Sequence, residues 1–247
     1  MPRALILNPN TSSSVTTMLV EHVTAMLGVQ DKLAWQVLGV TASFGAEYIA
    51  SETAYAIAAH AALDAFAQTA PGSGDVVLIG CFGDPGLEAL REISPVPVIG
   101  LAEAAMKEAA EFGRFAIVTG GPRWAPILRR RAQAAGLAAQ LARSYILKES
   151  GAELAADREA AIGLLATACE EAMEVSHPDA IILGGAALAG IGDLLADHLG
   201  LPVIDSVSAA ARAMQKAVAN PTASIGPDGV DYHGLSPALA QRLRKTG

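Results

Sequence analysis

The chain has 247 residues, of which 25 are Asp or Glu and 17 are Lys or Arg, so its formal charge is −8. With 52% hydrophobic and 17% charged residues, it has the composition of a globular protein with one large domain or two small ones. The acidic balance, with a basic run only at 242–245, argues against a nucleic-acid partner.

The sequence also argues against a membrane partner and an exported chain. The uncharged stretch 180–192 is shorter than the roughly 20 apolar residues that a spanning helix needs, and the apolar start 4–7 is too short for a signal peptide. Cys81 and Cys169 fit no disulfide or metal framework, which is typical of a reducing compartment. We therefore expect a cytoplasmic protein.

Short apolar segments bounded by Gly or Pro alternate with Ala-rich segments of helical periodicity. This alternation predicts βαβ units, a mostly parallel sheet and an α/β fold. Strands are predicted at residues 3–7, 34–39, 75–80, 96–99, 114–118, 144–147, 179–184 and 202–205. Helices are predicted at residues 12–27, 50–69, 84–92, 101–111, 123–135, 153–175, 187–199 and 206–219.

The predicted strands form two similar sets of four, which indicates a duplicated unit. Three pairs of segments are similar and occur in the same order: 75–81 with 179–185, 97–100 with 202–205, and 3–10 with 114–121. Chance similarity between Val- and Ile-rich strands is the alternative. We predict two pseudo-symmetric lobes, each a four-stranded parallel sheet flanked by helices: residues 1–99 plus 207–247, and residues 100–206.

In such a pair of lobes, the loops after matching strands face each other across a cleft. Open α/β sheets bind ligands at these carboxyl ends, so we expect the active site in the interlobe cleft. Residues 220–247, which are rich in Gly and Pro, are predicted to form an extension with a short terminal helix, packed on a neighbour or mobile.

Cys81 follows the third predicted strand, in a loop that contains Gly, Asp and Pro. We predict Asp84 as the N-cap and Pro85 as the first residue of the next helix. Unpaired N–H groups and the helix dipole at such a position lower the pKa of a thiol from its free value of about 8.5. Cys81 could then exchange protons near neutral pH. The alternative is a buried cysteine that acts only as a small hydrophobe.

Cys169 and the histidines are predicted to be structural. Cys169 shares an apolar helical stripe with Ile162, Leu165 and Met173, which places it in the core. The five histidines form no metal-ligand spacing, and the Gly-rich segment 184–190 lacks the order of a dinucleotide-binding loop. We therefore expect no metal and no cofactor.

Three further loops are candidates for binding a substrate. Residues 8–14 follow a strand and open a helix, so Asn10 and Ser12 could bind a carboxylate or a ureide carbonyl, or simply cap the helix. In the matching loop of the second lobe, Thr119 is a candidate contact, and Gly120 allows a ligand to approach the backbone. Loop 41–48 could form a cleft wall through Phe44, whereas surface positions are favoured for its residues Glu47 and Tyr48.

Several of these segments together are similar to a known enzyme family. Residues 7–12, 81–87, 100–105, 117–119 and 202–207 resemble the hydantoin racemase branch of the aspartate/glutamate racemase superfamily, and the resemblance covers about residues 3–215. It implies two pseudo-symmetric α/β lobes, no cofactor, and one cysteine per lobe on either side of a planar carbanion. One thiolate would remove a proton from the substrate carbon, and the opposite thiol would return one to the other face.

The chain departs from that pattern in the second lobe. Cys81 matches the first-lobe cysteine, but Gly185 occupies the position of the second and cannot move a proton. We expect Cys81 to act at the substrate carbon. The N–H groups of Phe82, Gly83, Gly185 and Ala186, together with Asn10 and Thr119, are expected to hold the substrate oxygens.

Several activities remain open for a site with one thiol. The first expectation is a racemase or isomerase acting on a hydantoin, an allantoin-like ureide or an amino-acid derivative. The alternatives are a lyase of the arylmalonate decarboxylase type, which protonates one face, an isomerase with Cys81 as covalent nucleophile, and a non-catalytic binding protein. The expected partners are a small-molecule substrate and further copies of the chain in a homo-oligomer.

Overall fold

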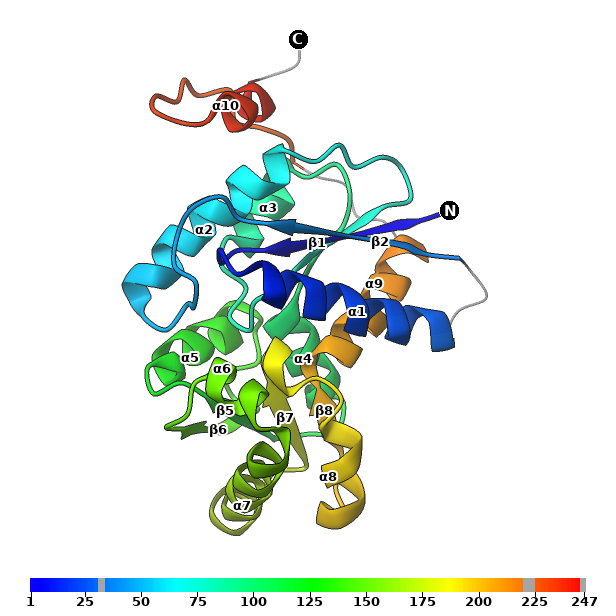
Figure 1. Cartoon of the computed structure of the whole chain (residues 1–247), viewed down its shortest axis with the longest axis vertical. Coiled ribbons are helices and arrows are strands. Elements are labelled where there is room, and N and C mark those ends of the chain that lie inside the picture. Colours follow the sequence, from blue (N-terminus) through cyan, green and yellow to red (C-terminus); the bar gives the residue numbers. More distant parts are fainter. Residues whose placement is uncertain (31–33, 220–224, 245–247) are drawn as a thin grey trace.

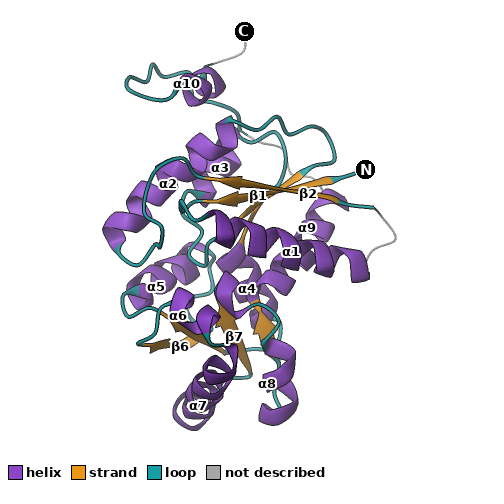
Figure 2. Ribbon diagram, viewed as in Figure 1, coloured by secondary structure: helices purple, strands orange, loops and turns teal. Residues whose placement is uncertain are grey.

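A computed structural model describes residues 1–30, 34–219 and 225–244. It contains two four-stranded parallel sheets, with strand orders β2-β1-β3-β4 and β6-β5-β7-β8 (Figures 1 and 2). The strands are β1 (Arg3–Asn8), β2 (Gln36–Thr41), β3 (Val76–Ile79), β4 (Val98–Gly100), β5 (Phe115–Gly120), β6 (Leu141–Leu147), β7 (Ala180–Gly184) and β8 (Val203–Asp205). All eight predicted strands are confirmed. The same strand order in both sheets agrees with the predicted duplication.

Helices connect successive strands, as a parallel sheet requires. They are α1 (Ser13–Gln30), α2 (Glu52–Ala67), α3 (Leu87–Ile93), α4 (Leu101–Ala110), α5 (Trp124–Ala134), α6 (Gly151–Ala156), α7 (Arg158–Ser176), α8 (Gly192–Leu199), α9 (Ser206–Ala219) and α10 (Pro237–Leu243), with a 3₁₀ turn η1 (Ala186–Leu188). No helix among the described residues is both long and apolar enough to cross a membrane.

Three predicted helix boundaries are wrong. The helix predicted at 153–175 is two helices, because Asp157 interrupts it and caps α7 by accepting a hydrogen bond from the Ala160 N–H at 3.0 Å. The helix predicted at 187–199 begins at Gly192, after Gly190 with a φ of +73°. The helix predicted at 84–92 begins at Leu87, because the backbone of Asp84 is left-handed, with a φ of +56°.

The two sheets share one hydrophobic core. Their facing sides pack on α1, α4, α5 and α9, and this layer lies between the sheets (Figure 1). The opposite side of the first sheet packs on α2 and α3, and that of the second on α7 and α8. The central strands are therefore covered on both faces, which explains their continuous apolar sequences. The division of the chain into two lobes at residues 99 and 206 stays a prediction.

The C-terminal helix α10 packs on the first sheet's side of the molecule, against α2. Leu239 is buried there, and the guanidinium of Arg242 lies over the Phe66 ring and donates to the Thr69 carbonyl. Residues 220–224 and 245–247 of the predicted extension lie outside the described residues.

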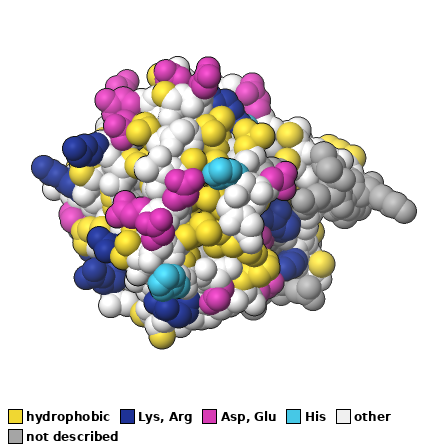
Figure 3. Space-filling model, turned by 90° about the horizontal axis from the view of Figure 1, so that it is seen from below, with side chains coloured by type: hydrophobic (Ala, Val, Ile, Leu, Met, Phe, Trp, Pro, Cys, Tyr) yellow, Lys and Arg dark blue, Asp and Glu magenta, His cyan; other side chains and the backbone are white. Residues whose placement is uncertain are grey.

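At the end of the molecule opposite to α10, acidic and basic side chains are interspersed on the surface rather than segregated (Figure 3).

Candidate active site

A pocket of about 630 Å³ lies at the carboxyl ends of the strands of both sheets. Loops after β1 and β3 contribute Asn10, Ser12 and Cys81, and the end of β5 and the loop after β7 contribute Thr119 and Gly185. β1 and β5 occupy equivalent positions in the two sheets, as do β3 and β7. The pocket therefore lies where open α/β folds bind ligands, and matched loops of the two halves form it.

Most of the expected site residues line this pocket, and two do not. The lining includes Asn10, Ser12, Cys81, Phe82, Thr119, Gly120, Gly185 and Ala186. Phe44 is not among the lining residues, because its ring packs edge-on against His60, with ring centroids 5.1 Å apart. Gly83 belongs to the turn that follows Cys81 but does not line the pocket, and its N–H donates to the Cys81 carbonyl at 2.8 Å. That N–H is not free to hold a substrate oxygen.

The pocket also contains residues that the sequence analysis did not assign to it. Glu47 and Tyr48 also line it; Glu47 is exposed, in agreement with the surface position expected for it, and Tyr48 is half-buried. Trp124, at the start of α5, forms part of the wall, and the segment 151–156 forms another part. Trp124 follows the Gly120–Gly121 loop in a chain with only 4% aromatic residues, which is the signal that could have identified it.

Cys81 is partly exposed and lies in a tight turn directly after β3. Its carbonyl accepts hydrogen bonds from the N–H groups of Gly83 at 2.8 Å and Asp84 at 3.0 Å. Because α3 begins only at Leu87, Cys81 is not in the first turn of a helix, and the expected lowering of its pKa is wrong. Burial, and then the negative charge of Asp84, raise the pKa of the Cys81 thiol. The thiol therefore holds its proton at neutral pH.

The prediction that Asp84 caps the helix that follows it is wrong, because its side chain caps a different helix, α4. Its two carboxylate oxygens accept the N–H groups of Ala102 and Glu103, both at 2.8 Å, at the start of α4. The carboxylate fits because residue 100 is glycine, where an added Cβ would lie 2.5 Å from the Asp84 side chain. Burial raises the pKa of Asp84 to about 7, against the effect of these hydrogen bonds and of Arg131.

Polar groups on the other walls can orient a ligand. The Asn10 side-chain oxygen accepts from the Asn8 amide at 2.8 Å and from the Ser12 N–H at 2.9 Å, which fixes the side chain. No hydrogen bond of the Asn10 amide nitrogen is seen within the described residues, so it can donate to a ligand. The Thr119 hydroxyl donates to the Gly184 carbonyl at 2.6 Å, which leaves its oxygen as an acceptor.

Gly185 presents no side chain at the position that the resemblance assigns to a second cysteine. Its backbone has a φ of +126°, and an added Cβ would find no atom within 4 Å. Its N–H donates to the Ser206 hydroxyl at 3.2 Å, so it is not free for a substrate oxygen as expected. Among the described residues that line the pocket, the only ionisable side chains are those of Glu47, Tyr48 and Cys81.

Residues 5–214 match the Asp/Glu/Hydantoin racemase family. The chain belongs to this family. It is 31% identical over 219 residues to the hydantoin racemase of Paenarthrobacter aurescens, which covers 88% of this chain and 91% of that protein. The resemblance seen in the sequence is therefore confirmed at the level of the family.

Solved structures agree with this assignment. The allantoin racemase of Pseudomonas fluorescens superposes with a TM-score of 0.87 at 28% identity, covering 94% of this chain and 100% of that one. The allantoin racemase of Klebsiella pneumoniae superposes with a TM-score of 0.85 at 30% identity, covering 97% and 99%. The α/β fold with two four-stranded sheets is thus that of the racemase family.

In this chain, only one of the two matched loops of the pocket carries a side chain that can transfer a proton. The loop after β3 provides a thiol, whereas the equivalent loop after β7 provides a glycine. The other cysteine cannot take its place, because Cys169 is fully buried in the core between the second sheet and α7, as predicted. Among the described residues, no group of three or more His, Cys, Asp and Glu side chains could hold a metal ion.

Proposed function

We propose that this member of the racemase family transfers a proton at the acidic carbon of a neutral cyclic ureide, with Cys81 as its single thiol. The observation that carries the proposal is the pairing of Cys81 and Gly185 on the wall of one pocket. Cys81 can exchange a proton with carbon, whereas Gly185 has no group that can do so. Relatives named hydantoin racemase and allantoin racemase support a ureide as the substrate.

The chemistry of the pocket favours an uncharged ring over a dicarboxylate. A volume of about 630 Å³ is in the range of small-molecule sites. The described lining residues include no Lys or Arg to pair with a carboxylate. A ureide ring offers carbonyl oxygens to the amide of Asn10 and N–H groups to the hydroxyl of Thr119, and an apolar substituent would contact Met18, Ile49 or Trp124.

One thiol and the solvent exchange all the protons in this reaction. Burial and Asp84 raise the pKa of Cys81, so the reaction starts from the small fraction of thiolate that forms when the thiol loses its proton to water. That thiolate takes the C–H proton, and the electron pair of that bond passes into an enolate that spreads onto the neighbouring carbonyl. Return of the same proton from the thiol restores the starting configuration. Solvent exchange occurs when the thiol trades its S–H proton with water before it returns a proton to the same face. Inversion requires a proton for the opposite face, which must come from solvent at the Gly185 wall, and the thiol then gives the proton that it took to the hydroxide left behind. We therefore expect solvent exchange at the carbon to be faster than inversion.

One observation favours a second candidate, a lyase with single-face protonation. Burial and Asp84 keep the Cys81 thiol protonated, so it is ready to donate a proton rather than to accept one. A carbanion left after loss of CO₂ needs only such a donor. If this is the activity, Cys81 protonates one face and the product has a single configuration.

The experiment is proton NMR in D₂O with single enantiomers of 5-substituted hydantoins and allantoin, and with arylmalonates and maleate. Deuterium uptake that outpaces loss of optical activity supports the first proposal, and CO₂ loss with one product configuration supports the second. Exchange at the same rate as inversion would contradict the single-thiol mechanism. A thioether adduct seen by mass spectrometry would instead indicate a covalent nucleophile.

Two variants make that result specific to the thiol in the pocket. Cys81→Ser should abolish exchange, because a serine hydroxyl is far less acidic than a thiol. Cys169→Ser is the matched control, since Cys169 is fully buried in the core and away from the pocket. Binding of a ureide without any turnover by the unmodified protein would favour the non-catalytic alternative.

A further inference from the structure

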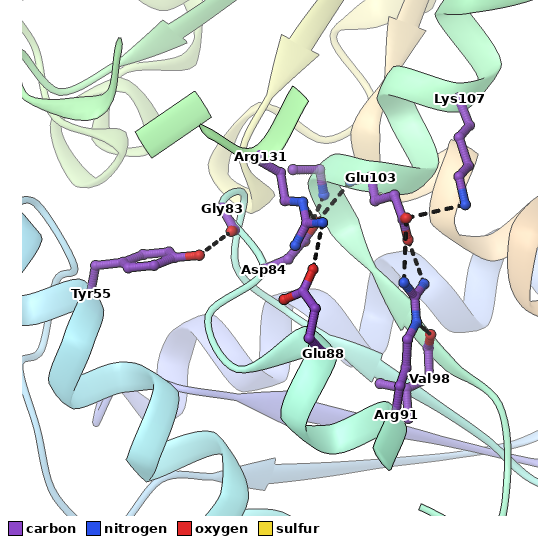
Figure 4. A network of polar contacts seen from close by, with 10 residues as sticks. Tyr55, Gly83, Asp84, Glu88, Arg91, Val98, Glu103, Lys107 and Arg131 are labelled. Carbon is purple, nitrogen blue, oxygen red and sulfur yellow. Dashed lines mark hydrogen bonds and ion pairs between the residues drawn. The ribbon is translucent and has the colours of Figure 1, made fainter. Parts of the chain in front are cut away.

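A chain of charged side chains lies next to the turn that carries Cys81, with two buried members and an exposed one, Glu88. Asp84 is fully buried, and Arg131 is 5% exposed. Nη2 of Arg131 lies 2.6 Å from a carboxylate oxygen of Glu88, and its Nε lies 4.0 Å from Oδ2 of Asp84. Figure 4 shows the guanidinium between the two carboxylates. Asp84 and Glu88 belong to the part of the chain with the first sheet, and Arg131 to the part with the second.

The Asp84–Arg131 contact is an attraction of charges rather than a hydrogen bond. Both Asp84 oxygens already accept N–H groups of α4, and Nε of Arg131 is buried without a hydrogen-bond partner within the described structure. Charges so far from water interact strongly. Loss of Arg131 leaves the buried carboxylate of Asp84 without the positive charge beside it, which is strongly unfavourable.

The same face of α5 reaches the Cys81 turn at a second point. Trp124 and Arg131 are seven residues apart and lie on one side of this helix. An added Cβ at Gly83 would lie 2.6 Å from the Trp124 ring, so the indole packs directly on the turn. From α2, the Tyr55 hydroxyl donates to the Gly83 carbonyl at 2.8 Å. The turn is therefore held from two helices, with its Asp84 fixed to the start of a third.

We propose that Arg131 is a positioning residue for Cys81: from α5 it holds the carboxylate of Asp84, and with it the turn that carries the thiol. The link is direct, because the Asp84 N–H donates to the Cys81 carbonyl. Arg131 thus ties the part of the chain with the second sheet to the one thiol of the site. Its consequence for catalysis rests on the function proposed above.

The ionisable groups that act on one another around Asp84 come from four helices and the turn itself. They are Tyr55 from α2, Glu88 from α3, Glu103 from α4, Arg131 from α5, and the Cys81 thiol. Glu103 is itself paired with Arg91 and Lys107 (Figure 4). The charge of Asp84 is the one that bears on the thiol.

The test compares Arg131→Met with Arg130→Met. Arg130 is the adjacent arginine on α5, but it pairs with the exposed Glu52, and it has no hydrogen bond or ion pair with the turn in the described part of the chain. The readouts are the rate of Cys81 alkylation by iodoacetamide across pH, followed by peptide mass spectrometry, and the kcat and KM of deuterium exchange. The first readout requires no turnover, so it stands even if no ureide is a substrate.

Arg131→Met should raise the rate of Cys81 alkylation at least fivefold at each pH of the profile, because the released turn exposes the thiol. It should lower kcat more than tenfold and change KM less than threefold, and Arg130→Met should leave all three values within twofold of wild type. Asp84→Asn should shift the alkylation profile to lower pH, because it removes the negative charge that opposes thiolate formation.

If Arg131→Met does not fold, the double variant Arg131→Met/Asp84→Asn replaces it, since it leaves no unpaired buried charge, and it is compared with Asp84→Asn alone. The same rise in alkylation and fall in kcat are then expected. The proposal is overturned if a folded Arg131→Met keeps the wild-type alkylation rate and kcat, or if the double variant keeps those of Asp84→Asn. A lack of exchange in the wild-type protein, with the alkylation results as expected, would overturn only the proposed function.

Discussion

Gly185→Cys is the perturbation that bears most directly on the single-thiol site. An added Cβ would meet no atom within 4 Å, so the side chain has space in the pocket wall. The φ of +126° is the obstacle, since it lies in a region that glycine adopts and other residues avoid. Forcing a side chain into such a conformation costs about 1–3 kcal/mol. For a chain of this length, this corresponds to a decrease in Tm of about 2–12 °C.

The chemical gain should be visible despite that cost. General acid–base groups contribute about 10²–10⁴-fold to a rate, so a second thiol on the wall equivalent to that of Cys81 should accelerate inversion at least tenfold relative to exchange. The assay combines deuterium uptake by NMR with chiral chromatography of the same samples. Gly185→Ala is the control, because it carries the same backbone strain and no thiol.

Two results would refute this reasoning. An unchanged Tm for Gly185→Ala would show that the backbone at this position is not strained. A folded Gly185→Cys protein with an accessible new thiol, and with the same ratio of inversion to exchange as the alanine variant, would show that the loop after β7 does not face the reacting carbon.

Three further predictions follow from single contacts. Cys81→Ser should reduce exchange below detection by NMR while circular dichroism stays unchanged. Gly184→Ala should destabilise the protein by about 1–3 kcal/mol in urea unfolding and lower its activity, because its Cβ would lie 2.1 Å from the Phe82 ring beside the thiol. Asp75→Asn should cost about 1–3 kcal/mol at pH 7. Burial raises the pKa of Asp75, but hydrogen bonds from Arg3 and a backbone N–H outweigh burial and lower it below 3.8. The stability that the Asp75 carboxylate contributes is therefore complete above pH 3.8 and is lost as the pH falls further. Urea unfolding at several pH values should show that the free energy of unfolding of the variant falls less steeply in acid.

The strands and the duplication could be predicted because their signal is local. A buried parallel strand must be apolar on both faces, and β7 is buried throughout, so its sequence identifies it without knowledge of its neighbours. One helix start was missed although its signal was present. Ser150 and Glu153 form a capping box, which places the start of α6 at Gly151 rather than at residue 153.

The local chemistry of the site could not be predicted because it depends on contacts distant in sequence. Asp84 precedes a proline and has the pattern of an N-cap, but its carboxylate is bound by Ala102 and Glu103 of another helix. This contact holds Asp84 in a left-handed conformation and delays the start of α3 to Leu87. As a result, Cys81 lies outside the first turn of α3, where the helix dipole was expected to lower its pKa, and burial raises that pKa instead.

The packing of Phe82 on Gly184 has a consequence for how sequences of this fold can vary. The ring comes from the loop after β3 and the glycine ends β7, so the two sheets meet at this contact beside the pocket. A larger residue at 184 is tolerable only with a smaller one at 82, so the two positions are expected to covary among homologues. An alignment in which they change independently would mean that the two sheets shift relative to each other to absorb the difference in volume.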